Sequence, residues 1–146
     1  MGHGRFVYRL AMLSLVSTLL IGCMGIRKEQ NLFDALGGQE GVNVIVENFI
    51  MQIARDERII DHFAVSNVER FRMMMREHLC FLADGLCEYT GDSMIDTHAG
   101  MGVTEGDFNA IVEDMMAAMN QAGVPIGTQN RLLSRLAKLR GEIIYL

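Results

Sequence analysis

The sequence predicts an all-α protein with a single domain. Apolar residues recur at steps of three and four from residue 32 onward, and no run alternates with a period of two over a useful length. Hydrophobic residues make up 50% of the 146 positions, which is enough for one core in a chain of this length. The 18 acidic residues outnumber the 13 basic ones. We therefore expect no binding to nucleic acid, because neutralising phosphates requires clustered Lys and Arg.

The N-terminal segment has the composition of an export signal. Arg5 and Arg9 precede an uninterrupted apolar run, residues 10–22. This run is too short to span a bilayer comfortably, since about 20 apolar residues are needed. It leads into LIGC, which resembles the bacterial lipobox, where the cysteine receives a lipid and becomes the new N-terminus. The alternatives are an uncleaved anchor or a plain secretion signal, with Cys23 an ordinary apolar residue.

The lipoprotein interpretation divides the chain into three parts. We expect a lipoprotein signal peptide at 1–22, a lipid-anchored tether at 23–31 and the folded domain at 32–146, with the lipid on Cys23. Met24 follows the cysteine, in place of the aspartate that would indicate retention at the inner membrane. By resemblance to Gram-negative lipoproteins, the expected location is the periplasmic face of the outer membrane.

The first half of the domain predicts a helical turn followed by two long helices. Gly37 and Gly38 end the turn, LFDALGG. Asn67 is expected to cap the second long helix, because its side chain can accept from backbone N–H groups of the first turn. The apolar positions are Val42, Ile45, Val46, Phe49, Ile50 and Ile53 in the first long helix, Ile59, Ile60 and Phe63 in a short cluster, and Val68, Phe71, Met74, Met75, His78, Leu79 and Leu82 in the second.

The second half predicts a loose segment and then two more helices. Glycines and scattered polar residues between 83 and 102 indicate a loop with one helical turn around His98. Thr104 with Asp107 resembles a capping box, and Thr128 is expected to cap the last helix. The inner faces are Phe108, Ile111, Val112, Met115, Met116 and Met119, then Leu132, Leu133, Leu136, Leu139, Ile143 and Ile144.

Cys80 and Cys87 flank a turn-forming ADG sequence. In an oxidising periplasm they can form a disulfide that joins a helix end to the next loop. The alternative is a pair of buried thiols. Their spacing is not a zinc or redox motif.

His98 is a candidate metal ligand because of the residues around it. A methionine-rich apolar helix follows the glycine-rich segment that carries it. An iron porphyrin needs this combination, a neutral imidazole beside an apolar wall that keeps water away. For a histidine considered alone, a surface or packing role is the more common one. The loose segment also argues against an ordinary four-helix bundle, since a bundle closed by its own side chains does not need it.

The stretches LFDALGGQEGVNVIVENF, IIDHF and YTGDSMIDTHAGMGVTEGDF, with AMNQAGVP and LLSRLA further on, resemble the group I truncated haemoglobins. The resemblance runs from about Leu32 to Ile144, nearly all of the domain at 32–146. It implies a two-over-two helical sandwich around haem b. It also implies binding of oxygen, nitric oxide or carbon monoxide at a histidine-ligated iron.

Carried over by position, the resemblance makes His98 the proximal iron ligand and Phe63 the residue that packs on the porphyrin face. Met101 and Phe108 would line the proximal side, where sulfur and aromatic contacts suit a polarizable ring. Gly37–Gly38 and the sequence YTG would be structural. The expected cofactor-binding residues are Phe63, Phe71, Met75, His78, Met94, His98, Met101 and Phe108.

The expected distal side departs from the family pattern. Ile50 replaces a tyrosine and Met75 a glutamine, both hydrogen-bond donors to bound oxygen in relatives. Each donor contributes on the order of 1–3 kcal/mol, so oxygen should leave faster by one to several decades. Met74 replaces a basic propionate partner, for which Arg72 or Arg76 could substitute. The expected distal pocket is Phe49, Ile50, Phe71, Met75 and His78.

These residues favour a haem protein that binds diatomic gases. Reaction of oxygen with nitric oxide to give nitrate is a further activity, which would need an unidentified reductase. The alternative is a six-coordinate haem protein for electron transfer or redox sensing, with His78 or Met75 as the sixth ligand. If neither residue binds the iron, His78 and Met75 are packing residues. A third possibility is a haem-free helical adaptor.

Overall fold

The computed structural model describes residues 30–146, and within that range every regular element is helical. The all-α prediction is confirmed. The predicted signal peptide, lipid attachment at Cys23 and nearly all of the tether lie outside the described residues. None of the described helices is long and apolar enough to cross a membrane.

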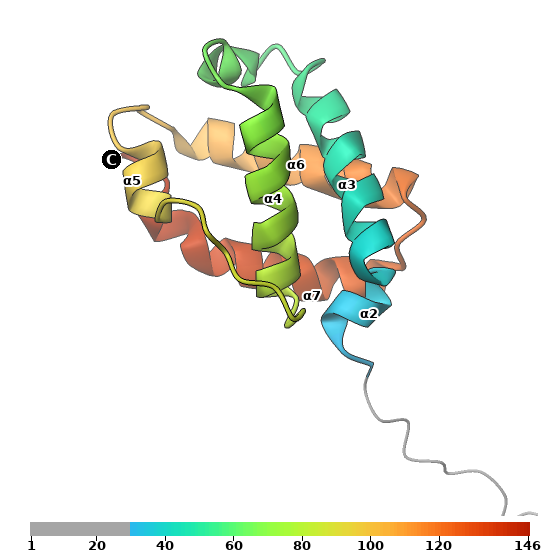
Figure 1. Ribbon diagram of the computed structural model, residues 1–146. Coiled ribbons are helices and arrows are strands. Elements are labelled where there is room, and N and C mark those ends of the chain that lie inside the picture. Colours follow the sequence, from blue (N-terminus) through green and yellow to red (C-terminus); the bar gives the residue numbers. More distant parts are fainter. Residues whose placement is uncertain (1–29) are drawn as a thin grey trace, which may run out of the picture.

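Four helices form two crossed layers. In Figure 1, α3 (Gly38–Ile53) and α4 (Val68–Leu82) stand side by side in front of α6 (Glu105–Gln121) and α7 (Ile126–Leu136), which run across behind them. This is the predicted two-over-two sandwich. The shorter elements are α2 (Leu32–Ala35), the 3-10 helix η1 (Ile60–Phe63), α5 (Met94–His98) and the 3-10 helix η2 (Ala137–Glu142).

Local sequence signals set most helix starts. Gly37 and Gly38 have φ angles of 95° and 64°, so the turn between α2 and α3 uses the left-handed conformation that glycine adopts without strain. Asn67 caps α4 by accepting from Arg70 N at 3.0 Å. Thr104 and Asp107 form the reciprocal capping box at the start of α6.

The last helix differs from the prediction at both ends. It begins at Ile126, two residues before Thr128, because the carbonyl of Pro125 already accepts from Thr128 N at 2.9 Å and Gln129 N at 3.0 Å. Proline fixes its own φ, −60° here, and no side chain caps this helix. After Leu136 the chain continues as the tighter helix η2 and not as an α-helix to Ile144.

The fully buried core lies between the two layers of the sandwich. It joins α2, α3, α4, α6 and α7 through Leu32, Val42, Ile45, Val46, Leu79, Met119 and Leu132. Two residues expected on inner faces are exposed, Met116 at 41% and Val68 at 49%. Met116 follows the buried Met115, and one residue turns the side chain by about 100° around the helix. Val68 lies in the first turn of α4.

A disulfide joins Cys80, at the end of α4, to Cys87, with their Cα atoms 6.0 Å apart. We call residues 80–87 the disulfide ring. Inside it, Asp84 has a φ of 62° and Gly85 N donates to Cys80 O at 2.8 Å. The ring is also fixed to α2, because Phe33 N donates to Ala83 O at 2.9 Å.

Asp114 is a buried carboxylate on α6, and its Oδ2 has no hydrogen-bond partner among residues 30–146. Burial raises the pKa of this carboxyl, and the charges of Asp56 and Glu113 act in the same direction. A carboxyl whose folded pKa is raised destabilises the fold as the pH climbs from its unfolded pKa to its folded pKa, and it is neutral in both states at low pH.

We therefore predict that Asp114→Asn raises the free energy of unfolding by on the order of 1 kcal/mol at pH 7. The gain should disappear by about pH 3, where the aspartate is largely protonated even in the unfolded chain, since its ordinary pKa is about 3.9. Urea denaturation at both pH values measures it. Glu88→Gln, at an exposed carboxylate that does not act on Asp114, is the control. A variant less stable than the wild type at pH 7 would contradict the prediction.

Candidate functional site

An apolar cavity of about 290 Å³ lies where α4, α5, α6 and η2 meet. Every side chain expected to bind the cofactor lines it. Apart from a few polar groups the wall is hydrophobic, as a site that excludes water requires. The eight expected residues are Phe63, Phe71, Met75, His78, Met94, His98, Met101 and Phe108.

His98 is the last residue of α5 and is half-buried. Its Nδ1 lies 2.8 Å from the backbone carbonyl of Met94. A carbonyl can only accept, so Nδ1 carries the proton and Nε2 keeps a free lone pair. This is the neutral tautomer that binds a metal, with the other ring nitrogen oriented by a backbone acceptor. The histidine therefore fits a haem iron as ligand.

The short helix α5 is formed by local bonds. Ser93 caps it, because its Oγ accepts from Asp96 N at 3.1 Å. Before it, Thr90 donates to Glu77 on α4 through both its N–H (3.0 Å) and its hydroxyl (2.8 Å). Gly91 allows the chain to pass Tyr89, since a Cβ at position 91 would lie 2.3 Å from the Tyr89 Oη. These contacts fix the loop that carries His98 relative to α4.

Aromatic rings form the wall on the α4 side. Phe71 packs edge-on against Phe63, with ring centroids 5.3 Å apart, and lies 6.4 Å from Phe49. Phe49 lines the cavity, as expected, but Ile50 does not. Residue 50 is turned by about 100° from residue 49 on the helix, and it packs against the core instead. No side chain from α3 brings a hydrogen-bond donor to this cavity.

His78 is the polar residue on the cavity face of α4. It is 8% exposed, and its ring packs against Tyr89 at a centroid distance of 4.9 Å. Burial lowers the pKa of His78, and the charge of His98 lowers it further. The imidazole is therefore neutral at pH 7. It makes no hydrogen bond to any residue between 30 and 146, so its nitrogens remain available to a bound group.

Another polar part of the cavity wall contains His62 and Asp107, which were not among the expected cofactor-binding residues. His62 Nε2 lies 3.4 Å from Asp107 Oδ2, and both residues line the cavity. The sequence could have indicated His62 as a cavity residue, because it directly precedes Phe63, the residue expected to pack on the porphyrin, in IIDHF. Bonds from Thr104 and then the His62 contact lower the pKa of Asp107.

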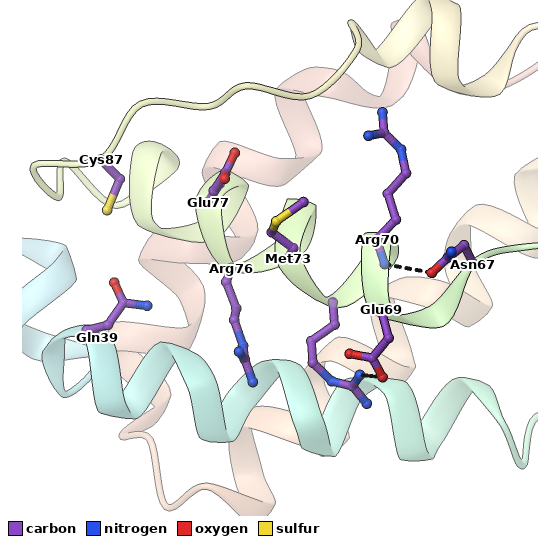
Figure 2. A pocket seen from close by; sticks show the side chains of 9 residues that line it. Gln39, Asn67, Glu69, Arg70, Met73, Arg76, Glu77 and Cys87 are labelled. Atoms are coloured by element: carbon purple, nitrogen blue, oxygen red, sulfur yellow. Dashed lines mark hydrogen bonds and ion pairs between the residues drawn. The ribbon is translucent and has the colours of Figure 1, made fainter.

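Arg72 and Arg76 do not lie at this cavity. Both line a separate open hollow of about 670 Å³ on the other side of α4. Figure 2 shows the side chain of Arg76 extended toward α3. On α3, Glu47 accepts from Arg72 Nε at 2.8 Å and from Arg76 Nη2 at 2.6 Å. The expectation that either arginine meets a haem propionate is therefore not supported, because both guanidinium groups hold α4 against α3.

A two-layer helical sandwich whose apolar cavity contains His98, with a free Nε2, and the unpartnered His78 has the features of a haem-binding helical protein. The comparisons agree. A family model described as bacterial-like globin matches residues 31–145. A group 1 truncated haemoglobin of Mycolicibacterium paratuberculosis is 32% identical over 113 residues, which covers 77% of this chain and 83% of that protein. One from Tetrahymena thermophila is 31% identical, covering 67% and 81%.

Solved structures show the same fold. The truncated haemoglobin of Tetrahymena pyriformis in its Fe(III) form has a TM-score of 0.76 at 24% identity, covering 79% of this chain and 98% of that one. A 2/2 haemoglobin from a Synechococcus species has a TM-score of 0.74 at 20% identity, covering 80% and 100%. The chain belongs to the bacterial-like globin family, as a group 1 truncated haemoglobin. Haem b is its cofactor, and it binds small ligands such as oxygen through the haem.

The environment of His78 gives a measurable prediction. In the haem-free protein, NMR titration should place the pKa of His78 below its ordinary value of about 6.5. His98→Gln removes the charge of His98 but leaves His78 buried. The pKa of His78 should therefore rise in this variant but stay below its ordinary value. A value at or above the ordinary one in the wild-type protein would show that the ring is solvated.

Proposed function

We propose that His98 is the proximal ligand of the haem iron and that the protein binds diatomic gases in a cavity with few hydrogen-bond donors. The observation that carries this proposal is the 2.8 Å contact between His98 Nδ1 and the Met94 carbonyl, which leaves Nε2 free inside the cavity. When bound, the haem supplies an iron atom that coordinates small gases reversibly.

The surrounding side chains determine which ligands are retained. Phe63 and Phe71 exclude water, and Met75 places a thioether where relatives have a donor. Among the residues of α4 that line the cavity, His78 is the one that can donate, since its ring is neutral and has no hydrogen-bond partner among the described residues. A hydrogen-bond donor stabilises bound oxygen. Oxygen should therefore dissociate faster from this protein than from relatives that have a tyrosine and a glutamine in the distal pocket.

For location, we propose a lipid-anchored protein at the cell envelope. The support is the sequence of the leader, with Arg5 and Arg9 before the apolar run that leads to Cys23. The disulfide between Cys80 and Cys87 is consistent with this, because such bonds persist in oxidising compartments. If the protein converts oxygen and nitric oxide to nitrate there, a separate reductase must supply the electrons.

The second candidate function is electron transfer or redox sensing through a six-coordinate haem. The observation that favours it is the position of His78, buried in the same cavity as His98 and close enough for the charge of one to lower the pKa of the other. A histidine without a hydrogen-bond partner is a competent iron ligand. Met75 is the other candidate for the sixth position.

We predict that His98→Gly abolishes tight haem binding in the full chain. Loss of a residue that only orients a metal-binding side chain weakens metal affinity by roughly 10–100-fold. Removing the metal-binding imidazole itself should weaken hemin affinity by more than this. Added imidazole should restore a Soret band, because it occupies the space of the deleted side chain. Absorption titration with hemin measures both.

His62→Ala is the matched control, since it removes another histidine from the same cavity and should leave haem binding intact. The proposal fails if His98→Gly binds hemin as tightly as the wild type. It also fails if imidazole has no effect while circular dichroism shows an intact helical fold.

The coordination number separates the two functions. We predict that the reduced protein without added ligand shows one broad visible band, as an open site does. Sharp, split bands would instead indicate an internal sixth ligand. In that case His78→Leu should convert them to a single broad band if His78 is the ligand, and Met75→Leu should do so if Met75 is.

A further inference from the structure

We propose that the disulfide ring, residues 80–87, rests on a phospholipid membrane surface beside the N-terminal anchor. The proposal builds on the lipid attachment at Cys23. It adds a second contact, made by the folded domain, which would hold the domain in one orientation.

The ring presents two apolar side chains to solvent. Leu86 is fully exposed and Phe81 is 55% exposed. They cannot move far apart, because the disulfide from Cys80 to Cys87 closes the loop that contains both. A loop already fixed by a disulfide loses little conformational entropy when it inserts side chains into another phase. Leu and Phe are also residues that amphipathic segments place at the boundary between headgroups and acyl chains.

The chain enters the folded domain beside this ring. Asn31 Nδ2 donates to Asp84 O at 3.1 Å, and Phe33 N donates to Ala83 O at 2.9 Å. Figure 1 shows α2 and the loop after α4 at the same end of the molecule. Gln30 is seven positions after Cys23, and seven residues of chain can span at most about 25 Å. A lipid on Cys23 would therefore keep the ring close to the membrane interface.

The charge of the ring is already compensated. Asp84 is its one charged residue, and its carboxylate lies 2.6 Å from Arg135 Nη2. The same guanidinium donates to the Leu82 carbonyl. A paired carboxylate costs less to bring near an apolar phase than a free one. Because a membrane is the surface that the anchor supplies, phospholipid is the occupant that fits these two side chains.

Photo-crosslinking in intact membranes tests the proposal. In the full chain, expressed in a Gram-negative host, Phe81 and Leu86 are replaced one at a time by benzoylphenylalanine. The matched control is the same replacement at Val65, which is 99% exposed and lies in the turn before α4. After irradiation, mass spectrometry measures adducts with phosphatidylethanolamine and phosphatidylglycerol. We expect several-fold more phospholipid adduct at 81 and 86 than at 65.

The outcomes separate this proposal from the one on which it rests. If the mature chain carries no acyl group at Cys23, the anchor is wrong and the membrane contact falls with it. If Cys23 is acylated but the three positions give equal lipid adducts, the anchor stands and the contact is refuted. Adducts at 81 and 86 that contain only another protein, or a second copy of this chain, also refute a lipid occupant.

Discussion

One hydrogen bond determines which nitrogen His98 presents to the cavity. The imidazole of His98 could in principle present either nitrogen to the cavity, and the contact between Nδ1 and the Met94 carbonyl selects Nε2. Met94 lies four residues before His98 in α5, on the same face of the helix. A carbonyl oxygen has two lone pairs, so that of Met94 can accept from the imidazole even within a helix.

Helix α4 serves two purposes on its two sides. One side carries Phe71, Met75 and His78 to the cavity. The other carries Arg72 and Arg76, which share Glu47 on α3. Such partly exposed ion pairs contribute little stability singly, but two on one carboxylate restrict how α4 can rotate. Rotation of α4 would exchange apolar and charged groups at the cavity, so the network preserves the apolar wall.

The sequence predicted the fold and the cavity lining well, because both follow from local signals. Asn67 and Thr104 are caps in sequence and structure, and the motif around His98 places it in the cavity. The sequence-based prediction was wrong where the burial of a side chain depends on its angular position around the helix axis. Ile50 and Met116 each lie one residue from a buried neighbour, and a periodic pattern does not resolve that difference. The direction of Arg72 depends on Glu47, 25 positions away, which no local pattern reports.

Much of the buried core lies away from the cavity, although Phe49, Ile59 and Met115 belong to both, and this affects how the site responds to loss of its ligand. The buried core side chains come from α2, α3, α4, α6 and α7 and the segments beside them, whereas α5 contributes none. Removing His98 or its cofactor therefore leaves most of the buried apolar area unchanged, and that area supplies most of the stability. Local opening should concentrate in α5 and in the 3-10 helices η1 and η2, because none of these elements contributes a buried side chain.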